Sequence, residues 1–354
     1  MTKLYLGVLS GTSMDAIDVA ALCFDNTVPN IINTYSAPLP IEYKNQYLSI
    51  INAGYCDLNK LGELDQWTGE LFADAVNECI SIHNLNKNEI IAIGSHGQTV
   101  WHAPQAPRPF SLQIGNPHVI ASKTGITTIA DFRRANMAAG GPGAPLAPIF
   151  HKAVFSSPTE SRCIINIGGF SNISILANDS YLGFDCGPGN CLMDYWVQNN
   201  FQQDFDVNGT IAATGNVLEP LLQTMLNDQF FSQPAPKSTG REYFNPAWLQ
   251  NKITACQINN FAPQDMQATL LQLTISCIAD AVRNYAIPNT SVFLCGGGAN
   301  NLELRKLLGL QLEKEILTTA ALGIPPEWVE AALFAWFAKQ NLGATYRAKI
   351  MTAI

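Results

Sequence analysis

The stretch Leu4–Phe24, LYLGVLSGTSMDAIDVAALCF, contains the pattern that decides the fold. Leu4–Ser10 is rich in aliphatic residues, Gly11–Asp15 has the composition of a turn, and Ile17–Phe24 resumes an apolar, strand-forming run. We therefore predict a β-hairpin whose turn is built from glycine, hydroxyl-bearing and acidic residues.

The same order of strand, small polar turn and strand returns later in the chain. Cys163–Ile167 is followed by Gly168–Asn172 and then by Ile173–Leu176. A third glycine cluster, Gly296–Gly298, follows the strand-like Ser291–Cys295 and precedes a segment whose leucines recur at helical spacing. The repeated hairpin predicts two related halves that face each other across a cleft.

Strands alternate with amphipathic segments, such as Leu58–His83 and Gln264–Tyr285, which predicts an α/β fold. The 354 residues are too many for one ordinary core and indicate two lobes. We place the boundary in the glycine- and proline-rich segment that begins at Gly140. This gives an N-terminal lobe of residues 1–140 and a C-terminal lobe of residues 141–354, with the last helix as a candidate to pack back on the first lobe.

Composition and charge exclude several classes of protein. Charged residues make up 14% of the chain, but the 47% hydrophobic content is that of a folded protein. A net charge of −8 without a basic run argues against a nucleic-acid partner. No apolar stretch reaches the roughly 20 residues of a membrane span, and the first residues do not resemble a signal peptide, so we expect a cytoplasmic protein with no membrane partner.

The cysteines and histidines do not form a recognisable metal motif. The nine cysteines include no C-x-x-C pair and lie mostly in apolar segments, which indicates reduced, buried thiols. The five histidines lack the spacing of zinc ligands. We expect no zinc site made by the protein alone.

The two hairpin turns and the third glycine cluster suit the binding of phosphate groups. Small residues leave backbone N–H groups and hydroxyls exposed, and these groups donate hydrogen bonds to phosphate oxygens. Each turn alone is also explained as an ordinary tight turn, but two matching turns favour a grip on a polyphosphate. The chain has no G-x-x-x-x-G-K-[ST] loop and no G-x-G-x-x-G in the N-terminal βαβ position, so the site is of another kind.

Three aspartates are candidates for the chemistry. Asp15 and Asp18 flank the first turn, where a carboxylate beside a triphosphate commonly holds Mg²⁺ directly or through water, and Asp15 is the better candidate. Aspartate is also a favoured turn residue. Asp185 ends an apolar run before Gly187-Pro188-Gly189, and is either a general base or a brace for this turn or the following helix.

Polar side chains also follow two expected strands. His96 and Gln98 come after the strand-like Ile91–Gly94, and Arg133 comes after another strand. Ligands collect at such strand ends, so His96 and Gln98 could hydrogen-bond sugar hydroxyls and Arg133 could pair with a carboxylate or phosphate. Each of them alone is more often structural. Glu330, at the start of a helix, is either a first-turn acid or a ligand contact.

Eight motifs, in order across nearly the whole chain, resemble those of the anhydro-N-acetylmuramic acid kinases, a family of the sugar kinase, Hsp70 and actin superfamily. The motifs are Gly11–Asp18, Ser95–Thr99, Asp131–Arg133, Gly143–Leu146, Asn166–Gly169, Phe184–Asn190, Pro236–Glu242 and Gly296–Gly298. The resemblance implies the two-lobed actin-like ATPase (ribonuclease H-like) fold, with a nucleotide cleft between the lobes. It also implies a homodimer.

The resemblance implies an enzyme that uses ATP and Mg²⁺ to open the 1,6-anhydro ring of 1,6-anhydro-N-acetylmuramic acid. It phosphorylates O6, giving N-acetylmuramic acid 6-phosphate and ADP in peptidoglycan recycling. Asp185 is then the base that activates water, and Arg133, His96 and Glu330 contact the sugar, to which the strand-end argument adds Gln98. The candidate ATP-binding residues are Gly11, Thr12, Ser13, Met14, Asp15, Ala16, Ile17, Asp18, Gly168, Gly169, Asn172, Gly296, Gly297 and Gly298.

Two positions depart from the family pattern: Ala16 stands where Gly is usual, and Cys186 where Thr is common. A positive φ at Ala16 would cost about 1 kcal/mol, so either φ is negative there or the hairpin is slightly strained. The residues leave two other functions open. One is a conventional sugar kinase in which Asp185 deprotonates an existing hydroxyl, and the other is a nucleotide-gated interaction protein of the actin type.

Overall fold

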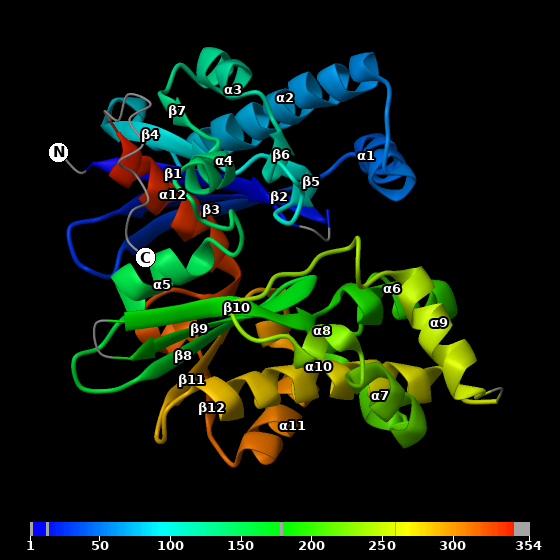
Figure 1. Cartoon of the computed structure of the whole chain (residues 1–354). Coiled ribbons are helices and arrows are strands. Elements are labelled where there is room, and N and C mark those ends of the chain that lie inside the picture. The colour runs from blue at the N-terminus through cyan, green and yellow to red at the C-terminus, as the bar shows by residue number, and fades with distance from the viewer. Residues whose placement is uncertain (1–2, 12–13, 178–179, 259, 343–354) are drawn as a thin grey trace. The chain divides into compact units, whose positions relative to one another are not determined.

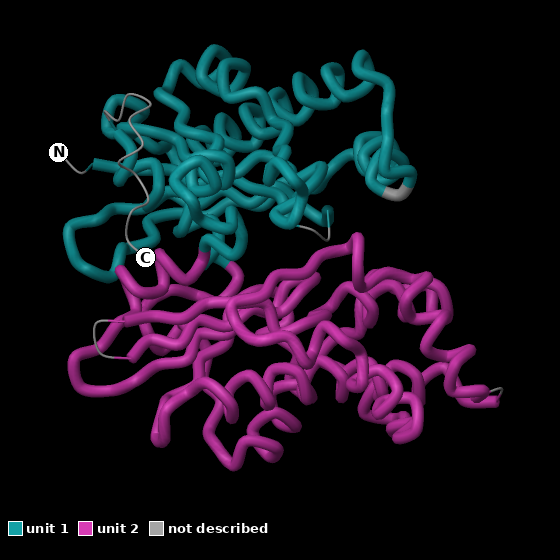
Figure 2. The backbone as a smooth tube through the Cα atoms, in the orientation of Figure 1, with its two compact units in different colours: residues 1–146, 328–354 teal, residues 147–327 magenta. Residues whose placement is uncertain are grey.

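The computed structural model describes residues 3–11, 14–177, 180–258 and 260–342. The chain divides into two compact units, one formed by Met1–Leu146 with Trp328–Ile354 and the other by Ala147–Glu327 (Figure 2). The division falls after Leu146, whereas the sequence favours residue 140. The last described helix belongs to the same unit as the N-terminal strands.

A five-stranded mixed sheet forms the centre of the first unit (Figure 1). β1 pairs antiparallel with β2, and β2 with β3, which confirms the first predicted hairpin; β4 is parallel to β1, and β7 is parallel to β4. In spatial order the strands are β3 (Asn30–Pro38), β2 (Ala16–Cys23), β1 (Leu4–Ser10), β4 (Ile90–Ser95) and β7 (Thr128–Ile129). A separate hairpin is formed by β5 (Gln98–Ala103) and β6 (Phe110–Ile114), which are joined by the loop of residues 104–109.

Helices pack on both faces of this sheet because successive side chains of a strand point to opposite sides. Leu6 and Val8 belong to a buried cluster with Phe72 and Val76 of α2. The helices of the unit are α1 (Ile41–Ala53), α2 (Leu58–Ile82), α3 (Pro117–Thr124), α4 (Phe132–Ala138) and α12 (Val329–Asn341).

Two glycines allow α12 to lie directly against β1 and β4. A Cβ atom on Gly7 would lie 1.8 Å from the carbonyl oxygen of Ala331, and one on Gly94 would lie 1.9 Å from that of Phe334. Both distances are far below van der Waals contact. The backbone of α12 therefore occupies the space that side chains would otherwise fill.

The second unit repeats the sheet of the first. Its strands are β10 (Ser180–Pro188), β9 (Phe170–Ala177), β8 (Arg162–Ile167), β11 (Ser291–Cys295) and β12 (Ile316–Thr318), again with the first strand in the middle. β8 and β9 are antiparallel, which confirms the second predicted hairpin, and β11 is parallel to β8 and β12. The helices are α5 (Ala147–Phe155), α6 (Cys191–Phe201), α7 (Glu219–Leu226), α8 (Gln229–Ser232), α9 (Pro246–Cys256), α10 (Pro263–Tyr285) and α11 (Leu302–Leu312).

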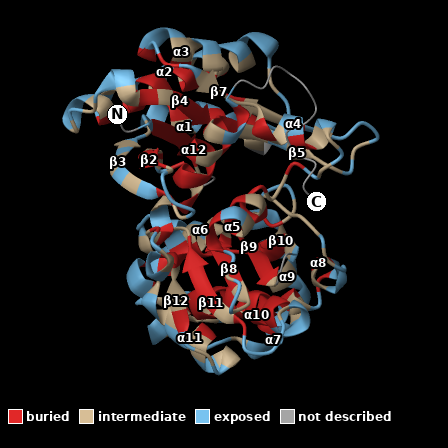
Figure 3. Cartoon of the chain, turned by 90° about the vertical axis from the view of Figure 1, so that its left-hand side faces the viewer, coloured by how far each residue is buried: buried red, intermediate tan, exposed pale blue. Residues whose placement is uncertain are grey.

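The inner strands of both sheets are largely buried, and the helices expose their outer faces (Figure 3). Short 3₁₀ turns lie at Lys87–Glu89, Val207–Gly209, Ala212–Thr214, Gly297–Asn300, Thr319–Leu322 and Pro326–Trp328. All nine cysteines are free, as the sequence predicts. Neither the long helices α2 and α10 nor any other described helix has the length and apolar character needed to cross a membrane.

Candidate active site

In the first unit, the parallel strands β1, β4 and β7 end at the same edge of the sheet. Ser10 ends β1 and Ser95 ends β4, and their buried hydroxyls have no hydrogen-bond partner among the described residues. Unpartnered buried hydroxyls are uncommon in proteins, and α/β sheets bind ligands at this edge. This edge is therefore the candidate site of the first unit.

The first turn leads from this edge into β2. Thr12 and Ser13 lie outside the described residues, and the Met14 N–H donates to the Gly11 carbonyl oxygen at 3.2 Å. The positive φ of 59° belongs to Met14, whose side chain is buried in a cluster with Tyr43. Ala16 already forms part of β2, so alanine at this position causes no backbone strain.

The two aspartates of the turn have different surroundings. Asp18 lies in β2 opposite Ser36 of β3 and accepts a hydrogen bond from the Ser36 hydroxyl at 2.8 Å, and burial raises its pKa. Asp15 is exposed, with Lys44 Nζ 3.3 Å from its carboxylate. A single exposed carboxylate fits Mg²⁺ on a nucleotide, because that ion takes most of its ligands from phosphates and water. Among the described residues no group of three metal-ligating side chains is present.

His96 and Arg133 form a fixed pair at the edge of the first sheet. Arg133 Nε donates to His96 Nε2 at 2.9 Å, and Arg133 Nη1 donates to the Gly143 carbonyl oxygen at 2.9 Å. Because Nε2 accepts, the proton of His96 is on Nδ1, which donates to the Gly97 carbonyl oxygen at 2.9 Å. Burial, followed by the charge of Arg133, lowers the pKa of His96 to about 3, so the ring is neutral. His96 thus orients the Arg133 guanidinium.

The structure places Glu330 near this pair and Gln98 away from it. The His96 ring lies 4.7 Å from that of Phe334, and Glu330 is one turn before Phe334 on the same face of α12. Glu330 is half-buried, whereas Glu327 is exposed. Gln98 is 2% exposed, and its Nε2 lies 3.5 Å from the Tyr47 hydroxyl, on the α1 side of the hairpin.

In the second unit the turn between β8 and β9 packs on the start of α6. The N–H groups of Gly189 and Asn190 donate to the carbonyl oxygens of Gly169 and Gly168 at 3.0 and 2.8 Å. Asn172, which follows the turn, lies opposite Asp185 in the β9–β10 pair. The buried Asn172 Oδ1 has no partner among the residues that the structure describes.

The third glycine cluster follows β11 at the same edge. A Cβ on Gly296, which has a φ of 78°, would lie 2.4 Å from Asn166 Oδ1, and one on Gly298 would lie 2.3 Å from Ile167 Cγ2. A Cβ on Gly297 would meet no atom of the described residues within 4 Å. Two of the glycines therefore serve packing against β8, and Gly297 lies open to an approaching ligand.

Asp185 is held by the segment that follows α8. Its N–H donates to the Lys237 carbonyl oxygen at 2.9 Å, and its Oδ2 accepts from the Thr239 N–H at 2.9 Å. The carboxylate is buried, with 7% of the residue exposed. A carboxylate that is oriented by a backbone amide at the end of a sheet is suited to accept a proton.

The side chain of Lys237 is directed away from Asp185. Its Nζ donates to the carbonyl oxygens of Phe230 and Phe231 at 3.0 and 3.2 Å and lies 4.6 Å from the centre of the Phe230 ring. Burial lowers the pKa of this ammonium group. Lys237 is therefore an anchor between its own segment and the end of α8.

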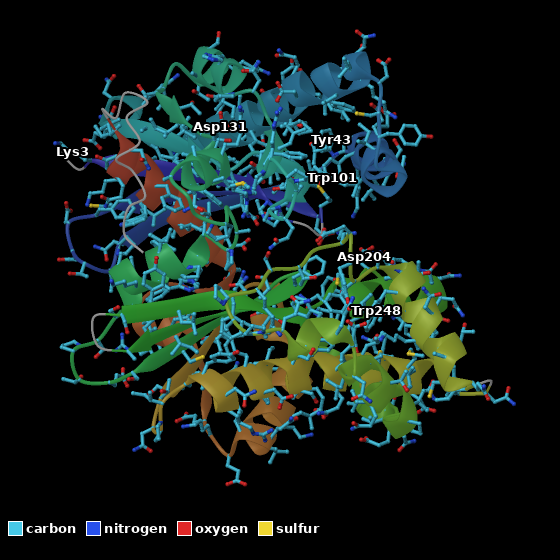
Figure 4. The ribbon with its side chains drawn as sticks, viewed as in Figure 1. Lys3, Tyr43, Trp101, Asp131, Asp204 and Trp248 are labelled. Atoms are coloured by element: carbon cyan, nitrogen blue, oxygen red, sulfur yellow. The ribbon has the colours of Figure 1, made fainter. Side chains whose placement is uncertain are left out.

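Asp228, a residue that the sequence analysis missed, anchors the other end of the same segment. Its carboxylate accepts from the Tyr243 hydroxyl at 2.6 Å and from Trp248 Nε1 at 2.9 Å, and Lys252 Nζ lies 2.8 Å away. Figure 4 labels Trp248 in this region. Burial acts to raise its pKa, but these donors outweigh burial and leave the pKa at about 2. The only available signal is an aspartate two residues before a pair of phenylalanines, and this arrangement is too common to interpret.

The family of the chain follows from comparison with known proteins. The model of the family described as anhydro-N-acetylmuramic acid kinase matches residues 3–346. The chain belongs to the anhydro-N-acetylmuramic acid kinase family. A curated anhydro-N-acetylmuramic acid kinase from Coxiella burnetii (strain RSA 493 / Nine Mile phase I) is 45% identical over 342 residues, which cover 96% of this chain and 91% of that protein. One from Pasteurella multocida (strain Pm70) is 43% identical over 344 residues, with coverage of 96% and 91%.

A solved structure supports the fold of this anhydro-N-acetylmuramic acid kinase family member. The (R)-2-hydroxyglutaryl-CoA dehydratase component A of Acidaminococcus fermentans matches with a TM-score of 0.51 at 13% identity, covering 97% of this chain and 100% of that one. At this identity the likeness concerns the fold alone. The actin-like α/β fold predicted from the sequence is confirmed, since both units have the same strand order.

Proposed function

We propose that this chain is a kinase that opens the 1,6-anhydro ring of 1,6-anhydro-N-acetylmuramic acid and transfers the γ-phosphoryl group of ATP to O6. The products are N-acetylmuramic acid 6-phosphate and ADP, and the reaction serves peptidoglycan recycling. The observation that carries the proposal is Asp185, a buried carboxylate oriented by the Thr239 N–H in a chain of this family.

In the proposed reaction Asp185 accepts a proton from water. The water oxygen bonds to the anomeric carbon as the bond between that carbon and O6 breaks, and O6 bonds to the γ-phosphorus as ADP leaves. The Thr239 N–H keeps one carboxylate oxygen in place, so that the base requires no reorientation during the reaction. Arg133, held by His96, is the proposed partner of the carboxylate of the sugar's lactyl group.

The proposed phosphate-binding groups are the turn that contains Gly11, the turn at Gly168 and Gly169, and the open Gly297. In the third group, no atom of the part of the chain that the structure describes lies within 4 Å of an added Cβ on Gly297, which supports the close approach of a ligand. Asp15 is the proposed protein ligand of Mg²⁺, directly or through water, and the ion would neutralise phosphate charge. Lys44, beside Asp15, would then have to release this carboxylate.

Mass spectrometry of the product tests the proposed function. The purified protein is given ATP, Mg²⁺ and 1,6-anhydro-N-acetylmuramic acid in water enriched in heavy oxygen. We expect the sugar to gain one phosphoryl group and one water, with heavy oxygen at the anomeric carbon. A gain of the phosphoryl group alone, on this or another sugar, would instead identify a conventional sugar kinase.

Two further properties come from the resemblance and the composition. We propose a homodimer and a cytoplasmic location. Light scattering on the purified chain tests the first, since a mass near twice 38.5 kDa is expected. Fractionation of the producing cells tests the second.

A further inference from the structure

The hairpin of β5 and β6 in the first unit has one polar face. The register of the two strands shifts after Thr99, so that Val100 is an extra residue. Such a bulge changes which side chains share a face of the hairpin. Thr99 and His102 consequently lie on one face with Ser111 and Gln113, as their hydrogen bonds show. We call these four residues the polar face.

Hydrogen bonds join the four residues of the polar face into one network. Gln113 Nε2 donates to Thr99 Oγ1 at 3.2 Å and to Ser111 Oγ at 2.8 Å, and Ser111 Oγ lies 3.1 Å from His102 Nδ1. Ser111 is 3% exposed, so its hydroxyl hydrogen needs an acceptor inside the protein, and His102 Nδ1 is that acceptor. The proton of the His102 ring is therefore on Nε2.

The two end atoms of this hydrogen-bond network, His102 Nε2 and Gln113 Oε1, have opposite hydrogen-bonding character. Burial, followed by the charge of Arg133, lowers the pKa of His102 to about 4, so the ring is neutral and Nε2–H is a donor. At the other end, Gln113 Oε1 is an acceptor. Reversing every hydrogen bond would exchange the two ends but would still leave one donor and one acceptor.

Both end atoms lack a partner. His102 Nε2 and Gln113 Oε1 are enclosed, and neither has a hydrogen bond to any described residue. Buried polar atoms in proteins are nearly always paired, because leaving one unpaired is costly. A ligand group that accepts at one atom and donates at the next would satisfy both, and a secondary amide is such a group.

The polar face lies beside the candidate sugar-binding residues of the same unit. α4, which carries Arg133, packs against β6, and the charge of Arg133 acts on His102. Gln113 and His96 line one pocket of about 460 Å³, which is in the size range of small-molecule sites. The other face of the hairpin packs towards α1, beside which Figure 4 shows Trp101.

We propose that the polar face binds the acetamido group of the sugar and makes the enzyme specific for N-acetylated substrates. This inference rests on the proposed function. His102 Nε2–H donates to the amide carbonyl oxygen, and Gln113 Oε1 accepts from the amide N–H. A sugar with a hydroxyl in place of the acetamido group leaves at least one of these enclosed atoms unpaired and is disfavoured.

Two substrates and three variants test the inference. The substrates are 1,6-anhydro-N-acetylmuramic acid and the same compound with a hydroxyl in place of the acetamido group. The variants are His102→Phe, Gln113→Met and, as a control on the opposite face of the hairpin, Trp101→Phe. We expect the first two variants to lose about 10- to 100-fold in kcat/KM on the acetamido substrate and less than about threefold on the analogue. The control should keep the selectivity of the wild type.

Equal losses on both substrates would overturn the inference and leave the proposed function intact. No turnover of the acetamido substrate by the wild type would overturn the proposed function, and the inference with it. If either variant fails to fold, the wild type provides a second readout. The nitrogen resonance of His102 Nε2 should shift when the acetamido sugar binds without ATP and stay in place with the analogue; no shift with either sugar would contradict the inference.

Discussion

Asp185 illustrates how a single residue depends on a segment distant in the chain. The sequence identifies this aspartate by its place before a glycine-rich turn, but the group that orients it, the Thr239 N–H, comes from a loop after α8. A backbone amide leaves no mark in the side-chain pattern. The catalytic candidate could therefore be predicted from the sequence, and its support could not.

Replacing Asp185 by asparagine should abolish most of the activity while keeping the fold. Asparagine retains an oxygen that can accept from the Thr239 N–H but has no basic group for a water proton. We expect kcat to fall by about 10²- to 10⁴-fold. The midpoint of thermal unfolding and the affinity for ATP should stay within error of the wild type. A kcat above one tenth of the wild-type value would exclude Asp185 as the base.

The pair of His96 and Arg133 predicts a difference between two substitutions. In H96Q the glutamine oxygen can replace Nε2 as the acceptor for Arg133 Nε, whereas the shorter asparagine of H96N cannot reach it. We expect KM for the sugar to rise about tenfold in H96N and clearly less in H96Q, because one hydrogen bond to a charged group is lost. Steady-state kinetics with ATP at saturation provides the measurement. Equal KM values in both variants would show that His96 does not act through Arg133.

The sequence analysis named both members of this pair but assigned His96 a direct sugar contact. The two ring nitrogens are already occupied by Arg133 and Gly97, which only the coordinates show. Gln98 was grouped with His96 because it lies two residues away. Gln98 begins the β5–β6 hairpin, and its side chain lies on the side of the hairpin that faces α1. The sequence pattern alone does not show to which side of a hairpin a side chain points.

At the scale of elements, glycines have two distinct uses that look alike in the sequence. In the cluster after β11, Gly298 allows close packing on Ile167, and Gly297 lies open. The sequence analysis treated the whole cluster as a ligand loop. The distinction depends on the distance to β8, a strand more than a hundred residues earlier.

Alanine substitutions in this cluster should separate stability from nucleotide binding. G298A places a Cβ 2.3 Å from Ile167 Cγ2 and should lower the free energy of unfolding by about 1–3 kcal/mol. G297A should leave the unfolding free energy unchanged within about 0.5 kcal/mol and raise KM for ATP. Denaturant unfolding and steady-state kinetics measure the two effects. A stable G298A together with an unstable G297A would contradict the packing described here.

The close contact of α12 with the first sheet predicts that one added methyl group, at Gly94, lowers the free energy of unfolding strongly. G94A brings a Cβ within 1.9 Å of the Phe334 carbonyl oxygen, and neither backbone can yield without displacing the helix. We expect a loss of about 3 kcal/mol or more in unfolding free energy. G62A is the matched control: its Cβ meets nothing within 4 Å, and alanine in this helix should stabilise by up to about 1 kcal/mol. An unchanged stability of G94A would show that α12 does not lie on β4.

For the whole molecule, buried neutral histidines make stability depend on pH. Burial lowers the pKa of His151 to about 3, and burial followed by the charge of Arg133 lowers that of His96 to about 3 and that of His102 to about 4. In the unfolded chain a histidine has a pKa of about 6.5 and binds a proton below it. The stabilisation is therefore complete above pH 6.5 and declines as the pH falls towards 4.

The free energy of unfolding should consequently decrease as the pH falls from 7 to 5, with a slope that approaches about 1.4 kcal/mol per pH unit for each neutral histidine once the pH is well below 6.5. Urea unfolding at several pH values measures this slope. H151N, whose amide can still bond to Ser174, removes one such group and should reduce the slope. The same slope in H151N and in the wild type would contradict a buried neutral His151.

The architecture of the whole chain was predictable where the sequence repeats itself. Two hairpins with glycine turns predicted two related halves, and the two sheets indeed have the same strand order. The place of α12 was no more than a candidate, because its pairing with β1 depends on Gly7, and a glycine inside a strand indicates only that something approaches closely.

The packing of α12 on the sheet of the first unit also has a consequence for synthesis on the ribosome. Ala147–Glu327 is one continuous stretch and can fold as soon as it has emerged. The unit that is translated first has to wait, because the face of its sheet around Gly7 and Gly94 stays uncovered until Val329–Asn341 has left the exit tunnel. We therefore expect the nascent chain to complete its second unit before its first, with one face of the N-terminal sheet uncovered in the interval.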